Sequence, residues 1–423
     1  MTDAPIEAVE AREILDNRLE PTLRVTVETP AGIGRADVPC GRSRGEREAH
    51  ELRDGDDRYR GRGVRRAVET VEEQVAPALA GRDATEQRGV DAALLDLDGT
   101  ATKEHLGGNV VTGVSLAALR AGAAATGRPL YRYVGGSDAH VLPLPVFDLI
   151  EGGELAGGDR PFQEHQVVPV GADSVAEAVR WTAEVYYELG DILRTEYGEA
   201  SLNVGDEGGC NPLGVTDPRE AFDLELRAIE ECGYGGEFAL AADVAASHFY
   251  DAETETYAFL GESMTRDELA DFYADLVDDY PIVSLEDPLH QRDLAGVADL
   301  TDRLDVQIIG DDLFTTTPDR LRAGIDRGAA NALLWKVNQV GTVTEAIEAA
   351  RIATRNGYAV QVSERSGQTP DTWLADLAVG LDAGQIKTGV TRGERTEQYN
   401  RLLAIEAELG EAATFGPPGD PLR

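Results

Sequence analysis

Lysine is scarce in this 423-residue chain, although arginine is not. Only Lys103, Lys336 and Lys387 stand among the 39 lysine and arginine residues, which face 78 acidic ones. The formal net charge of −39 repels polyanions, so the composition argues against nucleic acid and anionic membranes as partners. An acidic surface with few lysines is also typical of a halophilic protein, because a salt-rich cytoplasm screens the repulsion between like charges.

Cysteine and long apolar runs are lacking too. Cys40, Cys210 and Cys232 are too few and too irregularly spaced for a disulfide framework or a zinc site. The first residues, MTDAPIEAVEAREILD, have neither the basic nor the apolar region of a signal peptide. No apolar run approaches membrane-spanning length. We therefore expect a soluble, cytoplasmic protein.

The first 135 residues mix strand and helix patterns. Leu23, Val25 and Val27 alternate with polar residues, as in a half-buried strand. Residues 30–32 indicate a turn, and helical patterns follow at 63–79 and 113–126. The segment 131–145 is interpreted as a crossing between domains. The sequence thus predicts an N-terminal α+β capping domain over residues 1–135.

From residue 140 onwards, short apolar strands alternate with amphipathic helices, which is typical of βα units and a parallel sheet. The predicted strands are residues 201–204, 238–243, 281–287, 306–312, 331–336, 358–363 and 384–389. A helix is predicted from Thr342 to Asn356, because Thr342 and Glu345 can form a capping box. The predicted fold class is α/β, with a βα (TIM-like) barrel over residues 140–423.

Charged residues follow each predicted strand. In chain order they are Asp206 and Glu207, Asp243, Glu286 and Asp287, Asp311 and Asp312, Lys336, Glu364 and Arg365, and Lys387. In a parallel barrel the carboxyl ends of the strands share one rim, where active sites are built. Any one of these residues could belong to a solvated rim, but the whole series predicts a catalytic site.

The residue types at this rim favour metal-assisted proton transfer. Asp243, Glu286 and Asp311 offer hard oxygen ligands without His or Cys, which suits Mg²⁺ or Mn²⁺. Any single one of them could instead cap a helix. Lys336 ends the apolar run ALLW, and we expect this environment to lower its pKa, as a general base requires. Lys336 could also form a salt bridge with the neighbouring acids.

The sequence resembles the enolase family over nearly its whole length. The matching stretches are AREILD (11–16), ELRDGD (51–56), LDGT (97–100), GVSLA (113–117), PLYRYVGG (129–136), GDEGG (205–209), DVAAS (243–247), LEDP (285–288), GDDLFTT (310–316), KVNQVGT (336–342), RSGQT (365–369) and AGQIKTG (383–389). The resemblance implies an enolase-type barrel and a Mg²⁺-dependent lyase that dehydrates 2-phosphoglycerate to phosphoenolpyruvate. Such sites use a Lys or His base with one or two Mg²⁺ ions. A homodimer or larger homo-oligomer is also implied.

The resemblance also implies a role for each candidate residue. The catalytic residues are Lys336, which removes the α-proton, and Glu207 with Glu164, which protonate the departing hydroxide. The metal ligands are Asp243, Glu286 and Asp311 for one Mg²⁺, and Ser43 for a second that arrives with the substrate. The substrate-binding residues are Gln163, Glu286, Asp311, Lys387 for the carboxylate, and Arg365 and Ser366 for the phosphate.

Several residues at the predicted site differ from the family pattern. Leu155 and Glu364 stand where enolases carry histidine. A carboxylate beside a bound phosphate is repulsive. Arg42 and Arg44 would offset this repulsion if they face inward, although they could equally be solvated. His165 could partly replace a lost histidine.

The remaining cysteines and histidines are expected to have structural roles. Cys40 and Cys210 are interpreted as packing residues rather than nucleophiles. His248 is one of several histidines expected at the surface or in the core.

Three hypotheses follow from the sequence. The first is a phosphopyruvate hydratase whose partner is a small phosphorylated hydroxy acid. The second is a dehydratase paralogue that acts on a different 2-substituted 3-hydroxy acid, and Leu155 and Glu364 motivate it. The third is a non-catalytic binding protein. The retained metal and base residues argue against this last hypothesis, because a scaffold has no use for them.

Overall fold

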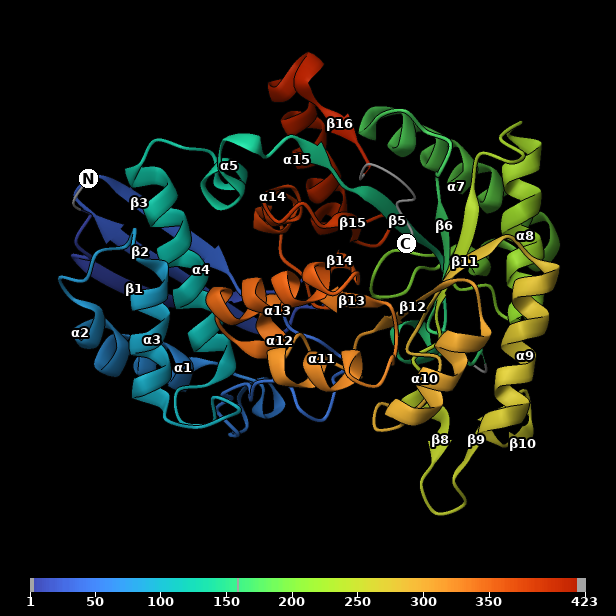
Figure 1. Ribbon diagram of the computed structural model, residues 1–423, viewed down its shortest axis with the longest axis horizontal. Coiled ribbons are helices and arrows are strands. Elements are labelled where there is room, and N and C mark those ends of the chain that lie inside the picture. Colours follow the sequence, from blue (N-terminus) through green and yellow to red (C-terminus); the bar gives the residue numbers. More distant parts are fainter. Residues whose placement is uncertain (1–3, 158–159, 417–423) are drawn as a thin grey trace.

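The computed structural model describes residues 4–157 and 160–416 of the chain. An N-terminal α+β part lies beside a larger barrel (Figure 1). The ends of the predicted domain ranges, residues 1–3 and 417–423, lie outside the described residues.

The N-terminal part is an antiparallel sheet covered by helices. β1 (Ala8–Leu15), β2 (Pro21–Thr29) and β3 (Gly32–Asp37) pair in this order. Leu23, Val25 and Val27 are fully buried, so the predicted half-buried strand is confirmed. α4 (Gly108–Ala125) packs across β2 and β3. The other helical segments of this part are η1 (Arg58–Gly61), α1 (Arg65–Thr70), η2 (Val71–Val75), α2 (Ala76–Leu79), α3 (Gln87–Asp98), α5 (Leu130–Gly135) and η3 (Gly136–Asp138).

The larger part is a closed barrel with helices around it (Figure 1). In pairing order the strands are β11 (Ile282–Glu286), β12 (Gln307–Gly310), β13 (Ala332–Trp335), β14 (Ala359–Ser363), β15 (Gly384–Lys387), β5 (Leu144–Glu151), β6 (Glu164–Val168) and β7 (Ala239–Asp243). The longer helices are α7 (Val175–Tyr197), α8 (Pro218–Glu231), α9 (Arg266–Asp279), α10 (Leu294–Arg303), α11 (Pro318–Ile325), α13 (Val343–Arg355), α14 (Trp373–Gly380) and α15 (Gly393–Leu409). The predicted α/β barrel is thus confirmed.

Shorter elements decorate the barrel. They are β4 (Val141–Leu142), which pairs with β16 (Thr414–Phe415), a small sheet of β8 (Tyr250–Asp251), β9 (Thr256–Phe259) and β10 (Glu262–Met264), and the short helices α6 (Gly153–Ala156), η4 (Glu199–Leu202), η5 (Ala246–Phe249), α12 (Val337–Val340) and η6 (Gly410–Ala412).

One barrel strand runs against all the others, so the expectation of a fully parallel sheet was wrong. β6 pairs antiparallel with both β5 and β7, whereas the other neighbours are parallel. Glu164, the first residue of β6, therefore lies opposite Glu151 and Asp243, the last residues of β5 and β7. The reversal brings the start of β6 to the rim formed by the ends of the other strands.

Six of the seven predicted barrel strands are confirmed as β7 and β11 to β15. The seventh was wrong, because residues 201 and 202 belong to the 3₁₀ helix η4. The Ser201 hydroxyl there donates to the Leu193 and Gly198 carbonyls, at 3.1 and 2.6 Å, which ties the segment to the end of α7. Such side-chain bonds compete with strand pairing. The predicted helix is confirmed as α13, with the Thr342 hydroxyl accepting from the Glu345 amide at 3.1 Å.

Polar contacts join the two parts of the molecule. Arg120 on α4 donates to both Asp371 oxygens at 2.6 and 2.7 Å, and Asp371 also accepts from the Asp37 amide at 3.0 Å. Cys40 and Gly367 exchange two backbone hydrogen bonds of 2.8 Å. The loop after β3 is therefore fixed over the rim of the barrel.

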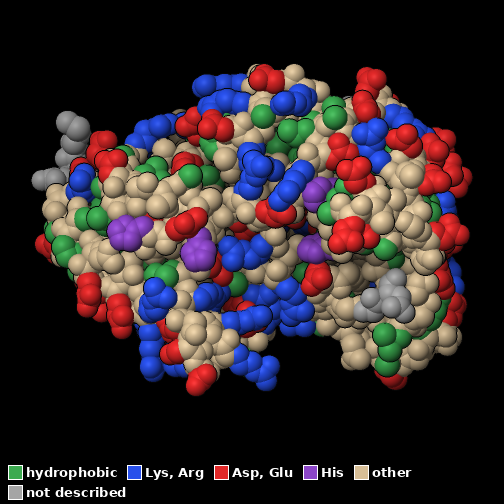
Figure 2. All heavy atoms as spheres, turned by 90° about the horizontal axis from the view of Figure 1, so that it is seen from below, with side chains coloured by type: hydrophobic (Ala, Val, Ile, Leu, Met, Phe, Trp, Pro, Cys, Tyr) green, Lys and Arg blue, Asp and Glu red, His purple; other side chains and the backbone are tan. Residues whose placement is uncertain are grey.

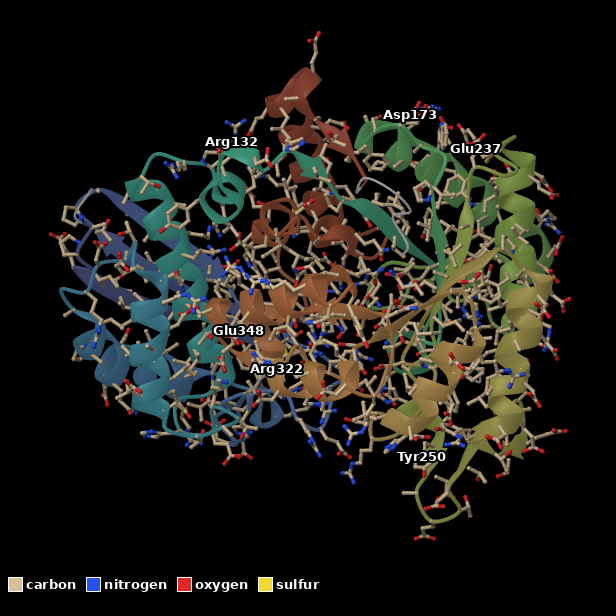
Figure 3. The ribbon with its side chains drawn as sticks, in the orientation of Figure 1. Arg132, Asp173, Glu237, Tyr250, Arg322 and Glu348 are labelled. Atoms are coloured by element: carbon tan, nitrogen blue, oxygen red, sulfur yellow. The ribbon has the colours of Figure 1, made fainter. Side chains whose placement is uncertain are left out.

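Charged side chains of both signs cover the outside of the molecule. Arg322 on α11 faces Glu348 on α13, with a nitrogen–oxygen distance of 2.7 Å (Figure 3). On the face shown in Figure 2, lysine and arginine side chains gather along the middle. Within residues 4–157 and 160–416, no single helix is both long and apolar enough to cross a membrane. Taken together, α4 and Leu130–Asp138 have the length and composition of a membrane span, but they are bent by 89° relative to each other.

We predict that Gly34→Ala destabilises the N-terminal part. A Cβ at Gly34 in β3 would lie 1.9 Å from the Ala117 carbonyl oxygen and 2.3 Å from the Ala121 amide nitrogen of α4. Because backbone atoms cannot rotate away, α4 must shift from the sheet. We expect a loss of about 1–3 kcal/mol in the free energy of unfolding, measured by denaturant titration. Gly235→Ala is the control, since no heavy atom lies within 4 Å of its added Cβ; equal stability of the two variants would contradict the close packing.

Candidate active site

The rim of the barrel and the loop after β3 enclose one polar pocket. It is lined by Ser43, Leu155, Gln163, Glu164, Glu207, Asp243, Asp311, Lys336, Ser363, Glu364, Arg365, Ser366 and Lys387. This set contains every predicted catalytic, substrate-binding and metal-binding residue except Glu286, which contacts Lys387 directly. The structure therefore brings the predicted site residues together, and their individual roles stay predictions.

Lys387 holds three of these carboxylates together at the end of β15. Its Nζ lies 2.9 Å from Glu164 Oε2, 2.7 Å from Glu286 Oε2 and 3.6 Å from Asp243 Oδ2. Burial lowers the pKa of Lys387, but these carboxylates outweigh burial and raise it well above its ordinary value. Lys387 is therefore a permanent cation, as the binding of a substrate carboxylate requires.

The predicted metal ligands fit a hard divalent cation. Asp243 and Glu286 lie opposite each other on β7 and β11, and Glu286 Oε1 has no hydrogen-bond partner among the described residues. Burial, reinforced by neighbouring carboxylates, raises the pKa of both groups well above the ordinary value. Because the anions are destabilised, a divalent cation would be bound favourably. Asp243, Glu286 and Asp311 would hold Mg²⁺ here.

Asp311 has other partners in this structure. Its Oδ2 accepts from Lys336 Nζ and its Oδ1 from Gln339 Nε2, both at 2.7 Å. It also lies within 4.8 Å of ligand atoms of Asp287 and Asp312. Asp287 accepts from the amides of Asp311 and Asp312, at 3.0 and 2.7 Å, so it shapes the turn that carries Asp311.

The pKa of Lys336 is raised, so the expectation of a lowered pKa was wrong. Burial lowers it most, but the Asp311 carboxylate 2.7 Å away and the Glu286 carboxylate raise it, and the net pKa is above the ordinary value. The apolar run before Lys336 indicated the burial correctly, since residues 332–335 are fully buried. It could not indicate the carboxylate, which comes from another strand end. Lys336 must therefore lose its proton before it can act as a base.

Glu207 has the properties of a proton donor near neutral pH. It lies in the loop before α8 and is 5% exposed. Burial and the Glu164 carboxylate together raise its pKa to about 7, although Arg395 and Lys387 oppose the rise. Because a general acid works best when its pKa is near the working pH, Glu207 suits that role.

The predicted phosphate-binding residues already contact the loop after β3. Arg365 donates to both Glu48 oxygens, at 2.9 and 3.0 Å, and to the Ser43 carbonyl at 3.0 Å. The Ser366 hydroxyl accepts from the Arg42 amide at 2.7 Å. A phosphate at this position would therefore share Arg365 with Glu48, a residue that no strand pattern marked in the sequence.

Glu364 is neutralised by a residue that the sequence did not single out. Arg395, on α15, places Nη1 2.5 Å from Glu364 Oε2. The arginines considered from the sequence lie elsewhere: Arg42 pairs with Asp206 at 2.9 Å, and Arg44 donates to the Ala49 carbonyl at 2.9 Å. No short-range pattern links residue 364 to a helix that follows the next barrel strand, so only the structure reveals this pair.

His165 does not replace a lost site histidine, so that expectation was wrong. Side chains alternate along a strand, and Glu164 faces the pocket while His165 faces the surrounding helices. The His165 ring lies 5.0 Å from that of Phe222 and 5.7 Å from that of Phe162. The imidazole that does reach the site is His248, whose Nε2 lies 2.8 Å from the Ser43 hydroxyl.

The buried thiols have the raised pKa of unreactive groups, and Cys40 Sγ also accepts from Arg53 Nη2 at 2.9 Å. Burial raises the pKa of Cys40 to about 12, and it also raises the pKa of Cys210. A thiol that stays protonated is a poor nucleophile. Leu155 is 3% exposed and contributes an apolar wall to the pocket.

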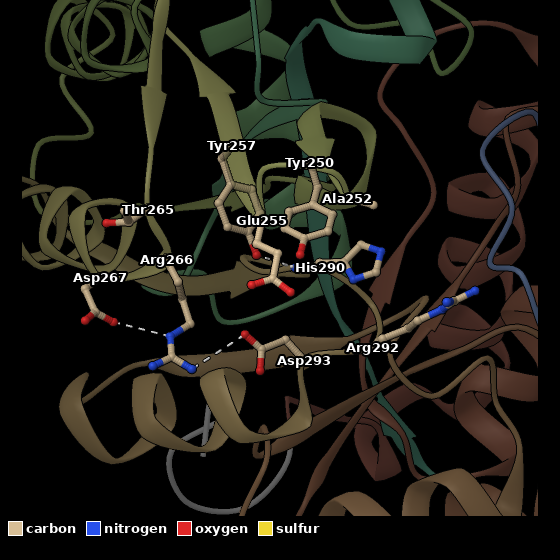
Figure 4. Close-up of a pocket in the computed structure, with 10 residues that line it drawn as sticks. All are labelled: Tyr250, Ala252, Glu255, Tyr257, Thr265, Arg266, Asp267, His290, Arg292 and Asp293. Atoms are coloured by element: carbon tan, nitrogen blue, oxygen red, sulfur yellow. Dashed lines mark hydrogen bonds and ion pairs between the residues drawn. The ribbon is translucent and has the colours of Figure 1, made fainter.

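A second pocket lies beside the β8–β10 sheet, away from the strand ends (Figure 4). Arg266 there pairs with Asp267 at 3.3 Å and Asp293 at 3.8 Å, and Arg292 pairs with Glu46. The Tyr250 and His290 rings stack at 4.3 Å. The residues that line this pocket include no lysine and none of the residues that line the rim site.

Comparisons with known proteins agree with this arrangement. Residues 6–134 match the family model "Enolase, N-terminal domain" and residues 139–418 match "Enolase, C-terminal TIM barrel domain". The chain is 56% identical to the enolase of Methanopyrus kandleri over 98% of both chains. It is 51% identical to that of Thermococcus kodakarensis, over 99% of this chain and 98% of the relative, and 52% identical to that of Pyrococcus furiosus, over 97% and 96%. With its two-part fold, its rim of acids and lysines and these matches, the chain belongs to the enolase family.

Proposed function

We propose that this chain is a Mg²⁺-dependent phosphopyruvate hydratase that dehydrates 2-phosphoglycerate to phosphoenolpyruvate in glycolysis and gluconeogenesis. The observation that carries the proposal is the single pocket in which Lys336, Glu207 and the acidic strand ends converge. Identities of 50% and more over nearly the full length favour this function over a paralogue with another substrate.

The proposal is supported by the positions of the proposed base and acid in the barrel. Lys336 follows β13 and Glu164 begins β6, and these strands are four positions apart in the closed order of eight. We assign Glu207 to the same side as Glu164, because the Glu164 carboxylate acts on Glu207 and raises its pKa. A substrate between them can lose a proton on one face and hydroxide on the other.

The reaction then needs two proton movements. Neutral Lys336 takes the α-proton first, and the electron pair of the broken C–H bond passes into the substrate carboxylate as an enolate. In the second step this pair forms the new C=C bond as the C–O bond to the leaving hydroxyl breaks. Glu207 gives its proton to the departing hydroxide, which leaves as water. When bound, Mg²⁺ stabilises the negative charge that develops on the substrate carboxylate. Lys387 adds a fixed positive charge for that carboxylate.

Finer features of this function rest on the family resemblance. We propose two Mg²⁺ ions, of which the second is held partly by Ser43. The enzyme would act as a homodimer or larger homo-oligomer in a salt-rich cytoplasm.

A steady-state assay tests the proposed reaction. We expect 2-phosphoglycerate to be dehydrated at an ordinary enzymatic rate, roughly 1–1000 per second, with Mg²⁺ in high salt, followed by the absorbance of phosphoenolpyruvate. Turnover of unphosphorylated or differently substituted 3-hydroxy acids in preference to 2-phosphoglycerate would instead support the paralogue.

Glu286→Gln should abolish turnover and weaken Mg²⁺ binding, because it keeps the side-chain shape but removes one of three ligand charges. Calorimetric titration with Mg²⁺ measures the binding directly. Glu348→Gln on the outer face of α13 is the control, since it removes the same charge from a surface ion pair. Near-normal affinity and turnover in Glu286→Gln would show that the metal lies elsewhere.

Lys336→Ala and Glu207→Gln should separate the two proton movements. Lys336→Ala is expected to abolish exchange of the substrate α-proton with deuterium in the solvent, because the base is lost. Glu207→Gln should block dehydration yet leave exchange measurable by NMR, because the acid acts after the base. Equal loss of exchange in both variants would mean that the roles are assigned wrongly or that the two steps are concerted.

A further inference from the structure

Arg395 connects the two segments that carry the site's acid and its predicted phosphate-binding residues. The side chain is completely buried. Its Nη2 donates to the Asp206 carbonyl at 2.9 Å and to the Ser366 carbonyl at 2.8 Å, and its Nη1 donates to the Arg365 carbonyl at 2.8 Å. Displacement of this guanidinium would therefore move both segments.

A buried guanidinium at this place also acts on Glu207 electrostatically. Arg395 lowers the pKa of Glu207, because a nearby cation favours the ionised carboxylate. A cation within about 4–6 Å of a carboxylate lowers its pKa by about 1–3. If the charge of Arg395 were not neutralised, Glu207 would lose at neutral pH the proton that it has to donate.

Glu364 supplies the neutralising charge. Its side chain is 1% exposed and pairs with Arg395 Nη1 at 2.5 Å. Its carboxylate also lies within 4.8 Å of ligand atoms of both Glu207 and Asp148. Glu364 therefore lies close to both the cation and the acid. Burial and the nearby Glu207 carboxylate raise the pKa of Glu364 well above its ordinary value, whereas the Arg395 guanidinium in contact with it favours the ionised carboxylate.

The other charged groups around Glu207 do not neutralise Arg395. Those that face it from the neighbouring elements are Asp148 and Glu151 of β5, Glu164 of β6, Lys336 after β13, Glu364 after β14, Lys387 of β15 and Arg395 of α15. Lys336 is bound to Asp311, and Lys387 is bound to Glu164 and Glu286. Arg395 is thus the cation whose effect on Glu207 depends on Glu364.

We propose that Glu364 is a positioning residue for the proton donor. By neutralising Arg395 it lets Glu207 remain protonated at the working pH, and it holds Arg395 against the carbonyls of both site segments. The inference rests on the proposed function, in which Glu207 is the acid. It assigns a purpose to the carboxylate at residue 364, where the family resemblance led us to expect a histidine.

Direct titration of Glu207 tests the proposal without reference to activity. In protein labelled with ¹³C at the glutamate carboxyl carbons, the Glu207 signal is identified by its loss in Glu207→Gln. We expect its midpoint near pH 7 in the unmodified chain and about one to three pH units lower in Glu364→Gln. An unchanged or higher midpoint in Glu364→Gln would overturn the proposal.

Three further variants separate charge from structure. Glu364→Asp keeps the charge, so its midpoint should stay near that of the unmodified chain. Glu394→Gln is the matched control, because Glu394 is a second carboxylate near Arg395, at 3.4 Å, and its loss should shift the midpoint less. The double change Glu364→Gln with Arg395→Gln removes both charges and should restore the midpoint. The double variant also tests the proposal if Glu364→Gln alone does not fold. A Glu207 midpoint that stays low in the double variant would contradict the role of Arg395.

Kinetics distinguish this inference from the proposed function. In Glu364→Gln at pH 7.5, dehydration of 2-phosphoglycerate should fall about tenfold for each pH unit by which the midpoint drops, while α-proton exchange by Lys336 persists. If the unmodified chain does not dehydrate 2-phosphoglycerate, the proposed function fails, and the titration still decides the role of Glu364. If it does so and Glu364→Gln dehydrates equally well, the role of Glu364 is refuted.

Discussion

The neutralisation of buried carboxylates by a few fixed cations is the constraint on which this site depends. Lys387 alone lies within 3.6 Å of oxygens from Glu164, Asp243 and Glu286. Removing an ionised group from water is costly, and an unpaired buried charge is costlier still. The chain contains only three lysines, and two of them occupy this rim. The third, Lys103, pairs with Glu345 at 2.8 Å.

The same constraint explains how the two parts of the molecule cooperate. Glu48 of the loop after β3 neutralises Arg365, and backbone hydrogen bonds between Cys40 and Gly367 fix this loop to the barrel. The loop thus carries Ser43 and Arg42 to the rim. Glu364 and Arg395 form a further pair on the side of the acid. Each cation in the pocket is matched to a carboxylate. Metal and substrate must therefore displace these ion-pair partners when they bind, rather than fill an apolar cavity.

The sequence predicted the parts of this architecture that local patterns encode. The strands β7 and β11 to β15 were recognisable because each is a short apolar run followed by a charged residue. β5 and β6 were not, because Asp148, Glu164 and Gln166 interrupt their apolar patterns with polar residues that are nonetheless buried. The antiparallel direction of β6 follows from pairing with both neighbours, and a five-residue segment carries no sign of it.

The site was predictable by residue type but not by pairing. Motifs placed Lys336, Lys387 and Glu207 in one pocket, yet the raised pKa of Lys336 depends on a carboxylate from a different strand end. Likewise, His165 and His248 could be told apart only by the direction of their side chains. The partners of Glu364 and Arg365, namely Arg395 and Glu48, lie in segments with no catalytic pattern. Electrostatic pairing is a property of the fold, so it could not be predicted from single positions.

The position of the metal tests the central claim most directly. A crystal structure of the chain with Mn²⁺ and 2-phosphoglycerate would locate the ion by its anomalous scattering. We predict a peak coordinated by Asp243, Glu286 and Asp311, with the substrate α-carbon between Lys336 and Glu207. A peak instead among Asp148, Glu207 and Glu364, or among Asp287, Asp311 and Asp312, the two other acidic groups of the rim, would contradict the assignment of the metal site and of the acid.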